Sequence, residues 1–118
     1  MAGRPERALH SEDAQEGFLV LSGECTLIVE DEERTLRQWD YFHCPAGTNH
    51  VLVGAGESPC SILMIGARPD EPIRYPASEV AARFGAAVAT ETAIPDEAYA
   101  DWPGEYQPVR LPWPLGAA

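Results

Sequence analysis

Turn-forming residues punctuate the centre of this chain every few residues, and the stretches between them alternate or run apolar over short spans. Short runs bounded by glycine, proline, asparagine and aspartate are typical of β-strands. An acidic tip at residues 31–33 ends a predicted hairpin. The run at 60–65 is the most apolar, and we expect it to be a central strand. The predicted strands cover residues 18–21, 25–29, 34–37, 41–44, 51–53 and 60–65.

The chain changes character after Arg68, where prolines mark a connector. Ser78 precedes an acidic and apolar run that ends at Gly85, which predicts a two-turn helix with a serine N-cap. Residues 95–100 begin with proline and predict a second short helix. We therefore divide a single domain into a barrel core, residues 1–68, and a C-terminal part, residues 69–118.

The end of the C-terminal part combines prolines with large aromatic residues. The prolines exclude regular structure, and the aromatic side chains favour burial. We expect an extended Pro/Trp-rich tail that lies across the barrel or across a partner; a disordered tail is the alternative. The residues concerned are Trp102, Pro103, Tyr106, Pro108, Pro112, Trp113 and Pro114.

Charge and composition argue against several kinds of partner. The 118 residues include 19 acidic and 8 basic side chains, a net charge of -11 at pH 7, which repels phosphate backbones and anionic membranes. Because the chain has no membrane-length apolar run and no secretory leader, we expect a cytoplasmic protein without nucleic-acid or membrane partners. Its 3 cysteines lack C-x-x-C spacing, so we expect reduced, mostly buried thiols.

Two segments far apart in the sequence carry candidate metal ligands. In the first, His10 and Glu12 alternate, so both side chains point to one face of an extended chain, and Glu16 joins them after a turn. In the second, a Pro-x-Gly-x-x-His turn follows an apolar strand and ends at His50. Two imidazoles and one carboxylate are enough to hold ferrous iron, and the second carboxylate is a fourth ligand or a base. We predict a divalent transition metal (iron, manganese, zinc or nickel) at His10, Glu12, Glu16 and His50.

Each of these residues also has a plain structural interpretation. His10 lies in a polar stretch, and the acidic residues around Glu16 are equally compatible with a solvated face. The neighbours His43 and Cys44 raise the alternative of a thiol nucleophile with an imidazole base. We do not favour it, because adjacent strand residues point to opposite faces. The joint spacing of the histidines, the carboxylates and the Pro-x-Gly-x-x-His turn favours the metal site.

The two segments resemble the two motifs of the cupin family. Glu16 is followed after six residues by Gly23, as at the end of the first motif, and Pro45 to His50 matches the heart of the second. His10 stands at the place of the first motif histidine. The resemblance extends from His10 to about Ala67.

The chain departs from the cupin pattern at several places. Glu12 stands where the second histidine is expected, which changes the ligand set to two imidazoles and two carboxylates. Trp39 replaces the opening glycine of the second motif, Gly54 replaces its closing asparagine, and no glycine precedes His10 at the motif's distance. Only nine residues precede His10, so we expect the barrel to lack an edge strand and to form a homodimer through that edge.

The resemblance implies an all-β, double-stranded β-helix (jelly-roll) fold and a metal-binding protein with a small organic ligand. Cupins of this kind include dioxygenases and isomerases, so a metalloenzyme of either type is implied. A non-catalytic cupin that binds a small ligand or serves as a structural module is the alternative. Strand parity predicts an apolar ligand pocket beside the metal, lined by Phe18, Val20, Phe42, Leu52, Ile62 and Met64.

Overall fold

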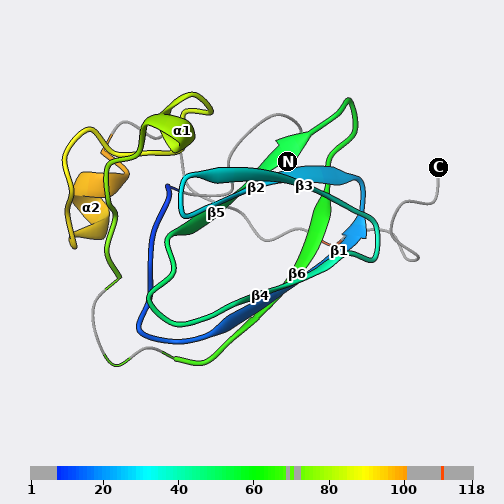
Figure 1. The fold of residues 1–118 in the computed structure, drawn as a ribbon, viewed down its shortest axis with the longest axis horizontal. Helices are drawn as coiled ribbons and strands as arrows, with labels where there is room; N and C mark the ends of the chain where they lie inside the picture. Colours follow the sequence, from blue (N-terminus) through cyan, green and yellow to red (C-terminus); the bar gives the residue numbers. More distant parts are fainter. Residues whose placement is uncertain (1–7, 69, 71–72, 101–109, 111–118) are drawn as a thin grey trace.

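Six strands in two antiparallel sheets form the body of the molecule in the computed structural model, which describes residues 8–68, 70, 73–100 and 110 (Figure 1). The strands are β1 (Glu16–Ser22), β2 (Glu24–Val29), β3 (Glu32–Arg37), β4 (Tyr41–Cys44), β5 (His50–Ala55) and β6 (Ser61–Gly66). One sheet has the order β4-β1-β6 and the other β3-β2-β5. The chain passes back and forth between the two sheets, and the predicted all-β jelly-roll fold is confirmed.

A two-residue loop joins β2 to β3. Glu30 and Asp31 form it with φ angles of 47° and 64°. Positive φ at both central residues is the geometry of a type I′ hairpin turn, whose twist matches that of the flanking strands. The predicted acidic tip at residues 31–33 was placed too late, because Glu32 and Glu33 already pair in β3. An acidic run shows that a turn is near, but it does not show which two residues make it.

Trp39 makes a left-handed turn between β3 and β4. Its φ is 72° and its side chain is 67% exposed. The turn is held by the Trp39 N–H, which donates to the Val20 carbonyl at 2.7 Å, and by the Asp40 N–H, which donates to the Arg37 carbonyl at 2.9 Å. Left-handed backbone favours glycine, which explains why the cupin pattern has glycine where this chain has Trp39.

The main core lies between the two sheets, where inward side chains of both meet. Leu52 of β5 belongs to it, while Val51 and Val53, on the other face of the same strand, pack in a second cluster with Ala81. β5 is therefore covered on both faces, which accounts for its continuous apolar sequence. The buried residues of the main core are Phe18, Val20, Cys25, Leu27, Cys44, Leu52 and Cys60.

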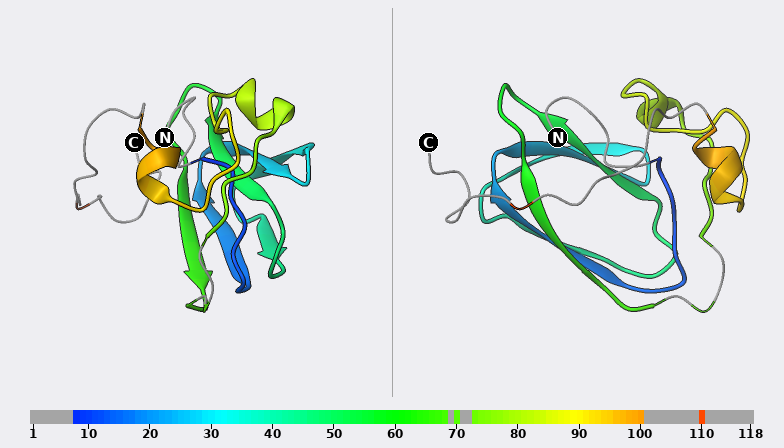
Figure 2. Two further views of the ribbon diagram at one scale, coloured as in Figure 1. Left: turned by 90° about the vertical axis from the view of Figure 1, so that its left-hand side faces the viewer. Right: turned by 180° about the vertical axis from the view of Figure 1, so that it is seen from behind.

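β6 lies at the edge of its sheet, contrary to the expectation of a central strand. Among the described strands it pairs with β1 alone, and Figure 2 shows it along one side of the barrel. Leu63, Met64 and Ile65 are 44%, 38% and 64% exposed. The prediction was wrong because an apolar run indicates only that the side chains of a strand favour burial. It does not indicate whether the strand has neighbours on both sides within its sheet.

Residues 73–100, which we call the cap, lie at one end of the barrel and contain both helices (Figure 1). Helix α1 (Glu79–Ala82) begins as predicted at an N-cap serine: the Ser78 hydroxyl accepts from the Ala81 N–H at 3.2 Å and donates to Asp31 at 2.6 Å. Helix α2 (Pro95–Ala98) begins at the predicted proline. Both helices end earlier than predicted.

In the part of the chain that the structure describes, no helix is long and apolar enough to span a bilayer. The predicted Pro/Trp-rich tail lies outside the described residues.

Candidate metal centre

His10, Glu16 and His50 come together at the end of the barrel that carries the cap. Each offers one donor atom, and these atoms all lie within 4.8 Å of one another. His50 and Glu16 are the first residues of β5 and β1, whereas His10 forms a single antiparallel bridge with His50. Two segments distant in the sequence, residues 10–16 and the start of β5, thus supply the three donors.

The Pro-x-Gly-x-x-His segment works as a tight turn that delivers His50. The Thr48 N–H donates to the Pro45 carbonyl at 3.3 Å, and Gly47 has a φ of 79°. Positive φ at the third position of such a turn is the reason for glycine there. The Gly47 N–H also donates to the Glu12 carbonyl at 2.7 Å, which ties the turn to the other ligand-bearing segment.

The side chains of this group are close together and shielded from solvent. His50 Nε2 lies 3.0 Å from Glu16 Oε1. His10 Nε2 lies 3.9 Å from the same oxygen and 3.5 Å from Glu12 Oε1. The side chains of both histidines are 2% exposed, and those of Glu12 and Glu16 are 10% and 14% exposed. All four residues singled out in the sequence are therefore neighbours, with Glu12 beside the three that converge.

Backbone carbonyls set the tautomers of both histidines. His10 Nδ1 lies 3.0 Å from the Ala8 carbonyl oxygen, and His50 Nδ1 lies 2.9 Å from that of Thr48. A carbonyl oxygen only accepts, so we assign the ring proton to Nδ1 in each case. In a neutral imidazole Nε2 then carries a lone pair, and both lone pairs face carboxylate oxygens. The four residues can share this space stably only around a positive charge, either a proton or a metal ion.

The metal-free site meets this requirement with a proton on His50. Burial alone lowers the pKa of His50, but hydrogen bonds to Cys44, to the Glu16 carboxylate and to the Thr48 carbonyl outweigh it and raise the pKa to about 10. The imidazolium and the Glu16 carboxylate form a buried ion pair. A metal ion at this place competes with that proton.

Cys44 is a neighbour of the site that sequence reasoning did not identify. Its Sγ lies 3.3 Å from His50 Nδ1, and the residue is buried, whereas His43 is exposed and pairs with Gln15. The expectation that His43 and Cys44 face opposite ways is confirmed. The contact with His50 follows from the turn that brings β5 back past β4, which spacing within one strand cannot reveal.

The predicted cysteine state agrees with the structure: Cys25, Cys44 and Cys60 are free and buried. Cys25 and Cys60 share a hydrogen bond inside the main core, and this bond together with burial raises the pKa of Cys25 well above its ordinary value.

Residues predicted to line an apolar pocket lie mostly in the main core. Phe18, Val20 and Leu52 are buried there, and Phe42 and Ile62 pack against them, whereas Met64 is 38% exposed at the β6 edge. The Phe18 ring centroid lies 5.4 Å from that of His50, so the core meets the polar site directly. The ligand pocket itself stays a prediction.

Known proteins place this arrangement in context. The cupin domain family matches residues 1–66. Among solved structures, the chain is similar to a candidate sugar phosphate isomerase from Acidithiobacillus ferrooxidans, with 25% identity, a TM-score of 0.56, and coverage of 62% of this chain and 47% of that one. It is also similar to a cupin protein from Bacteroides fragilis, with 24% identity, a TM-score of 0.54, and coverage of 57% and 58%.

A third solved structure with this fold is a sugar phosphate isomerase from a cupin superfamily in Silicibacter pomeroyi, with 23% identity, a TM-score of 0.55, and coverage of 62% of this chain and 48% of that one. The chain thus spans about half the length of the structures it matches. No curated protein matches it.

Proposed function

This chain belongs to the cupin family, and we propose that His10, Glu16 and His50 hold a divalent transition metal. The observation that carries the proposal is the convergence of two Nε2 atoms and one carboxylate oxygen within 4.8 Å, with both Nδ1 atoms directed at backbone carbonyls. Nitrogen and oxygen donors in this ratio suit iron, manganese, zinc or nickel. The charge of a divalent cation offsets those of Glu12 and Glu16, which makes burial of the group tolerable.

The reaction that this site supports best is a metal-assisted isomerisation of a small carbonyl compound. When bound, a divalent metal polarises a carbonyl oxygen and acidifies the neighbouring C–H. To Glu12, which lies beside the converging group, we assign the transfer of the proton from that carbon to the former carbonyl carbon, while the proton of the neighbouring hydroxyl passes to the former carbonyl oxygen. The similarity to a candidate sugar phosphate isomerase supports this class. A dioxygenase-type reaction would use the same three metal ligands, but it would not require Glu12 to transfer a proton. We therefore favour the isomerisation.

The small ligand of this reaction is proposed to contact the apolar side chains nearest the site. Phe18 and Phe42 stack with ring centroids 6.3 Å apart, and Phe18 in turn adjoins His50. Small-molecule sites are usually lined by apolar and aromatic side chains together with a few polar groups that orient the ligand.

A non-catalytic role is the second candidate, and one observation favours it. With a pKa of about 10, His50 keeps its proton at neutral pH and pairs with the Glu16 carboxylate, so one of the two carboxylates at the site is balanced without metal. In that case the four residues are a buried ion-pair network that joins residues 10–16 to the start of β5.

Metal analysis of protein purified without an affinity tag separates the two roles. We expect stoichiometric iron, manganese, zinc or nickel, and a higher melting temperature when the matching ion is added back to metal-free protein. His50→Ala is expected to abolish both effects. His43→Ala, which removes an exposed imidazole bonded to Gln15, is the matched control and is expected to keep them. Absence of bound metal together with an unchanged melting temperature in all four ions would refute the metal proposal.

The isomerase class has its own test. Incubation of metal-loaded protein with aldose and ketose phosphates in D₂O is expected to place deuterium on the carbon next to the carbonyl, as seen by NMR. Glu12→Gln is expected to stop this exchange while metal content is retained. Exchange that persists in Glu12→Gln would remove Glu12 from the proton-transfer role.

The first strand is not the exposed edge that the sequence led us to expect, because β1 lies between β4 and β6. We further propose a homodimer in which two β6 edges pair instead. The β6 edge, which no other described strand pairs with, supports this, because Ser61–Gly66 is uncharged and apolar in a chain whose net charge of -11 opposes self-association elsewhere. Light scattering at micromolar concentration is expected to give the dimer mass, and Ile65→Asp the monomer mass. A wild-type monomer would contradict the proposal.

A further inference from the structure

The segment that carries His10 is not part of either sheet. Within the described residues, its backbone pairs with the barrel strands through the bridge to His50, in which each residue's N–H donates to the other's carbonyl, at 3.1 Å and 2.9 Å. One bridge fixes neither the direction nor the twist of an extended chain. The bond from the Gly47 N–H to the Glu12 carbonyl holds the chain after His10, so the part around Leu9, His10 and Ser11 needs further support.

The cap supplies the backbone bonds on either side of His10. The Leu9 N–H donates to the Ala86 carbonyl at 2.6 Å. Ser11 and Arg74 exchange two bonds, with N–H to carbonyl distances of 2.9 Å and 3.0 Å. His10 is thus bonded to the barrel, while its neighbours on both sides are bonded to residues that follow the barrel by many positions.

Side-chain packing also joins the segment around His10 to the cap. Ala8 is buried with Tyr75 and Ala98 of the cap. Leu9 lies between the cap and the barrel, in a cluster that joins Ala81 and Ala86 to Ile28, Val51 and Val53. The Tyr75 ring is 4% exposed, and its centroid lies 6.2 Å from that of His10. The same ring makes an edge-type contact with Tyr99, with centroids 5.5 Å apart and an interplanar angle of 82°.

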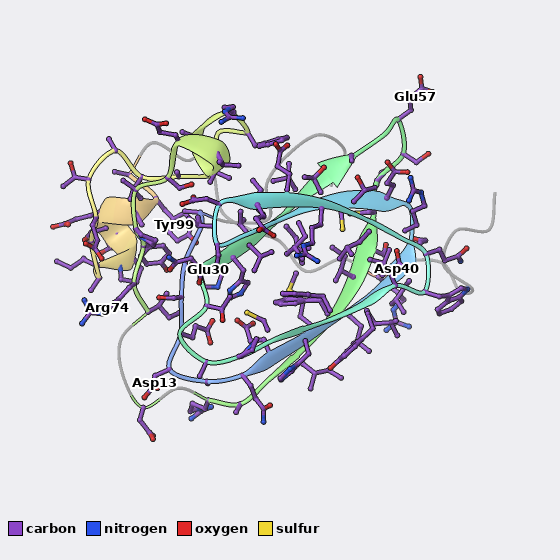
Figure 3. All side chains as sticks on the ribbon, viewed as in Figure 1. Asp13, Glu30, Asp40, Glu57, Arg74 and Tyr99 are labelled. Carbon is purple, nitrogen blue, oxygen red and sulfur yellow. The ribbon has the colours of Figure 1, made fainter. Side chains whose placement is uncertain are left out.

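Tyr75 is itself held in place within the cap. It exchanges two backbone hydrogen bonds with Thr92, at 2.7 Å and 3.1 Å. The Thr92 hydroxyl donates to Glu97 at 2.7 Å and accepts from the Ile94 N–H at 3.1 Å. Figure 3 shows Arg74 and Tyr99 at this end of the barrel and Asp40 and Glu57 at the other.

From these contacts we infer that the cap is a positioning element for the metal centre, and that Tyr75 is its positioning residue for His10. The cap lies beyond residues 1–66, the part that the cupin domain family matches. The barrel therefore places His50 and Glu16, and the cap, which lies outside the family region, helps to position the third candidate ligand, His10. The effect on metal affinity rests on the proposed function; the effect on the His10 segment does not.

Tyr75→Ala tests this inference in the full chain. Loss of the ring is expected to weaken metal binding by about tenfold to a hundredfold, as is usual when a supporting group of a ligand is removed. In Co²⁺-loaded protein the ligand-field spectrum is expected to shift, because the His10 nitrogen no longer holds its position. Tyr75→Phe keeps the ring and is expected to bind metal as the wild type does. Leu36→Ala, a partly buried β3 residue of the main core, controls for general loss of stability.

Hydrogen exchange on metal-free protein gives a second readout that does not depend on metal. Tyr75→Ala is expected to lose protection at the amides of Leu9, His10 and Ser11 while the amides of β2 and β5 keep theirs. If wild-type protein binds no metal but this selective loss occurs, the metal proposal fails and the positioning role stands. Unchanged exchange and unchanged metal affinity in Tyr75→Ala, or the same selective losses in Leu36→Ala, would overturn the inference. Should Tyr75→Ala fail to fold, Thr92→Val weakens the cap more mildly and is expected to give the same pattern in smaller measure.

Discussion

The two histidines of the site are equally buried but differently supported. His50 and His10 are each 1% exposed, and their ring centroids are 4.5 Å apart. His50 opens a strand that pairs residue by residue with β2 over its full length, whereas His10 is joined to the barrel by one bridge and held by the cap. Burial alone thus does not show how firmly a side chain is held. We call His50 with its strand β5 the His50 half of the site, and His10 with its flanking residues the His10 half. The two halves should respond differently to the same perturbation.

Removal of each imidazole is the strongest way to test this comparison. His50→Ala takes a hydrogen-bonded side chain out of the barrel interior, and we expect the free energy of unfolding of metal-free protein at pH 7 to fall by about 2–4 kcal/mol. His10→Ala is expected to lower it by about half as much, because the His10 segment pairs with fewer strand residues. Urea denaturation measures both, and equal losses would break the distinction between the two halves.

The pH dependence of stability is the next largest effect, and it belongs to the His50 half. The pKa of His50 is about 10 in the folded chain against 6.5 as the ordinary value, so its contribution is fully present below pH 6.5 and is lost as the pH rises toward 10. At about 1.4 kcal/mol per pH unit, this pKa difference sets an upper limit of about 5 kcal/mol, and we expect metal-free protein to lose about 2–4 kcal/mol of stability across this window.

Urea midpoints at several pH values measure this loss, and subtraction of the His50→Ala curve removes the contribution of other groups. Metal affinity is expected to rise over the same window, because the metal displaces the proton. A flat difference between wild type and His50→Ala would show that His50 does not hold the proton.

Gly47→Ala probes the turn that connects the two halves. A Cβ at Gly47 meets nothing within 4 Å, so the expected loss of about 1 kcal/mol comes from its φ of 79° alone. Gly56→Ala is a matched control, since Gly56 has a φ of 72° and equally open space but lies in the β5–β6 loop. Both variants are expected to lose similar stability in denaturation, and only Gly47→Ala to weaken metal binding. Equal metal affinities would show that the turn does not position the site.

Trp39→Gly has the smallest expected effect and leaves both halves untouched. Glycine relieves the left-handed backbone at this exposed position, at the expense of greater freedom in the unfolded chain, so we expect a gain of up to about 1 kcal/mol. Thermal denaturation measures it, and metal affinity should stay the same. A loss of stability would mean that the indole makes a contact worth more than the backbone strain.

Local patterns predicted the strands, the two helix starts and the four neighbours of the site, because alternation, caps and turn residues act over a few positions. The same patterns did not predict the exposure of β6, since burial depends on what the rest of the chain places against a strand. They also gave no sign of the Cys44–His50 contact or of Tyr75 beside His10. Those contacts join residues that only the complete topology brings together.

The cap also has a consequence for how the protein is made. His10 leaves the ribosome early, but Arg74, Tyr75 and Ala86, which hold its segment, are synthesised much later, and such contacts between distant parts of a chain form slowly. A nascent chain that ends before the cap already contains every residue of the candidate metal centre. It still lacks the cap residues that hold the His10 segment in place. Metal loading is therefore expected to follow translation. A stalled or clipped chain that lacks the cap is expected to form a barrel in which Glu16 and His50 are in place but His10 is not.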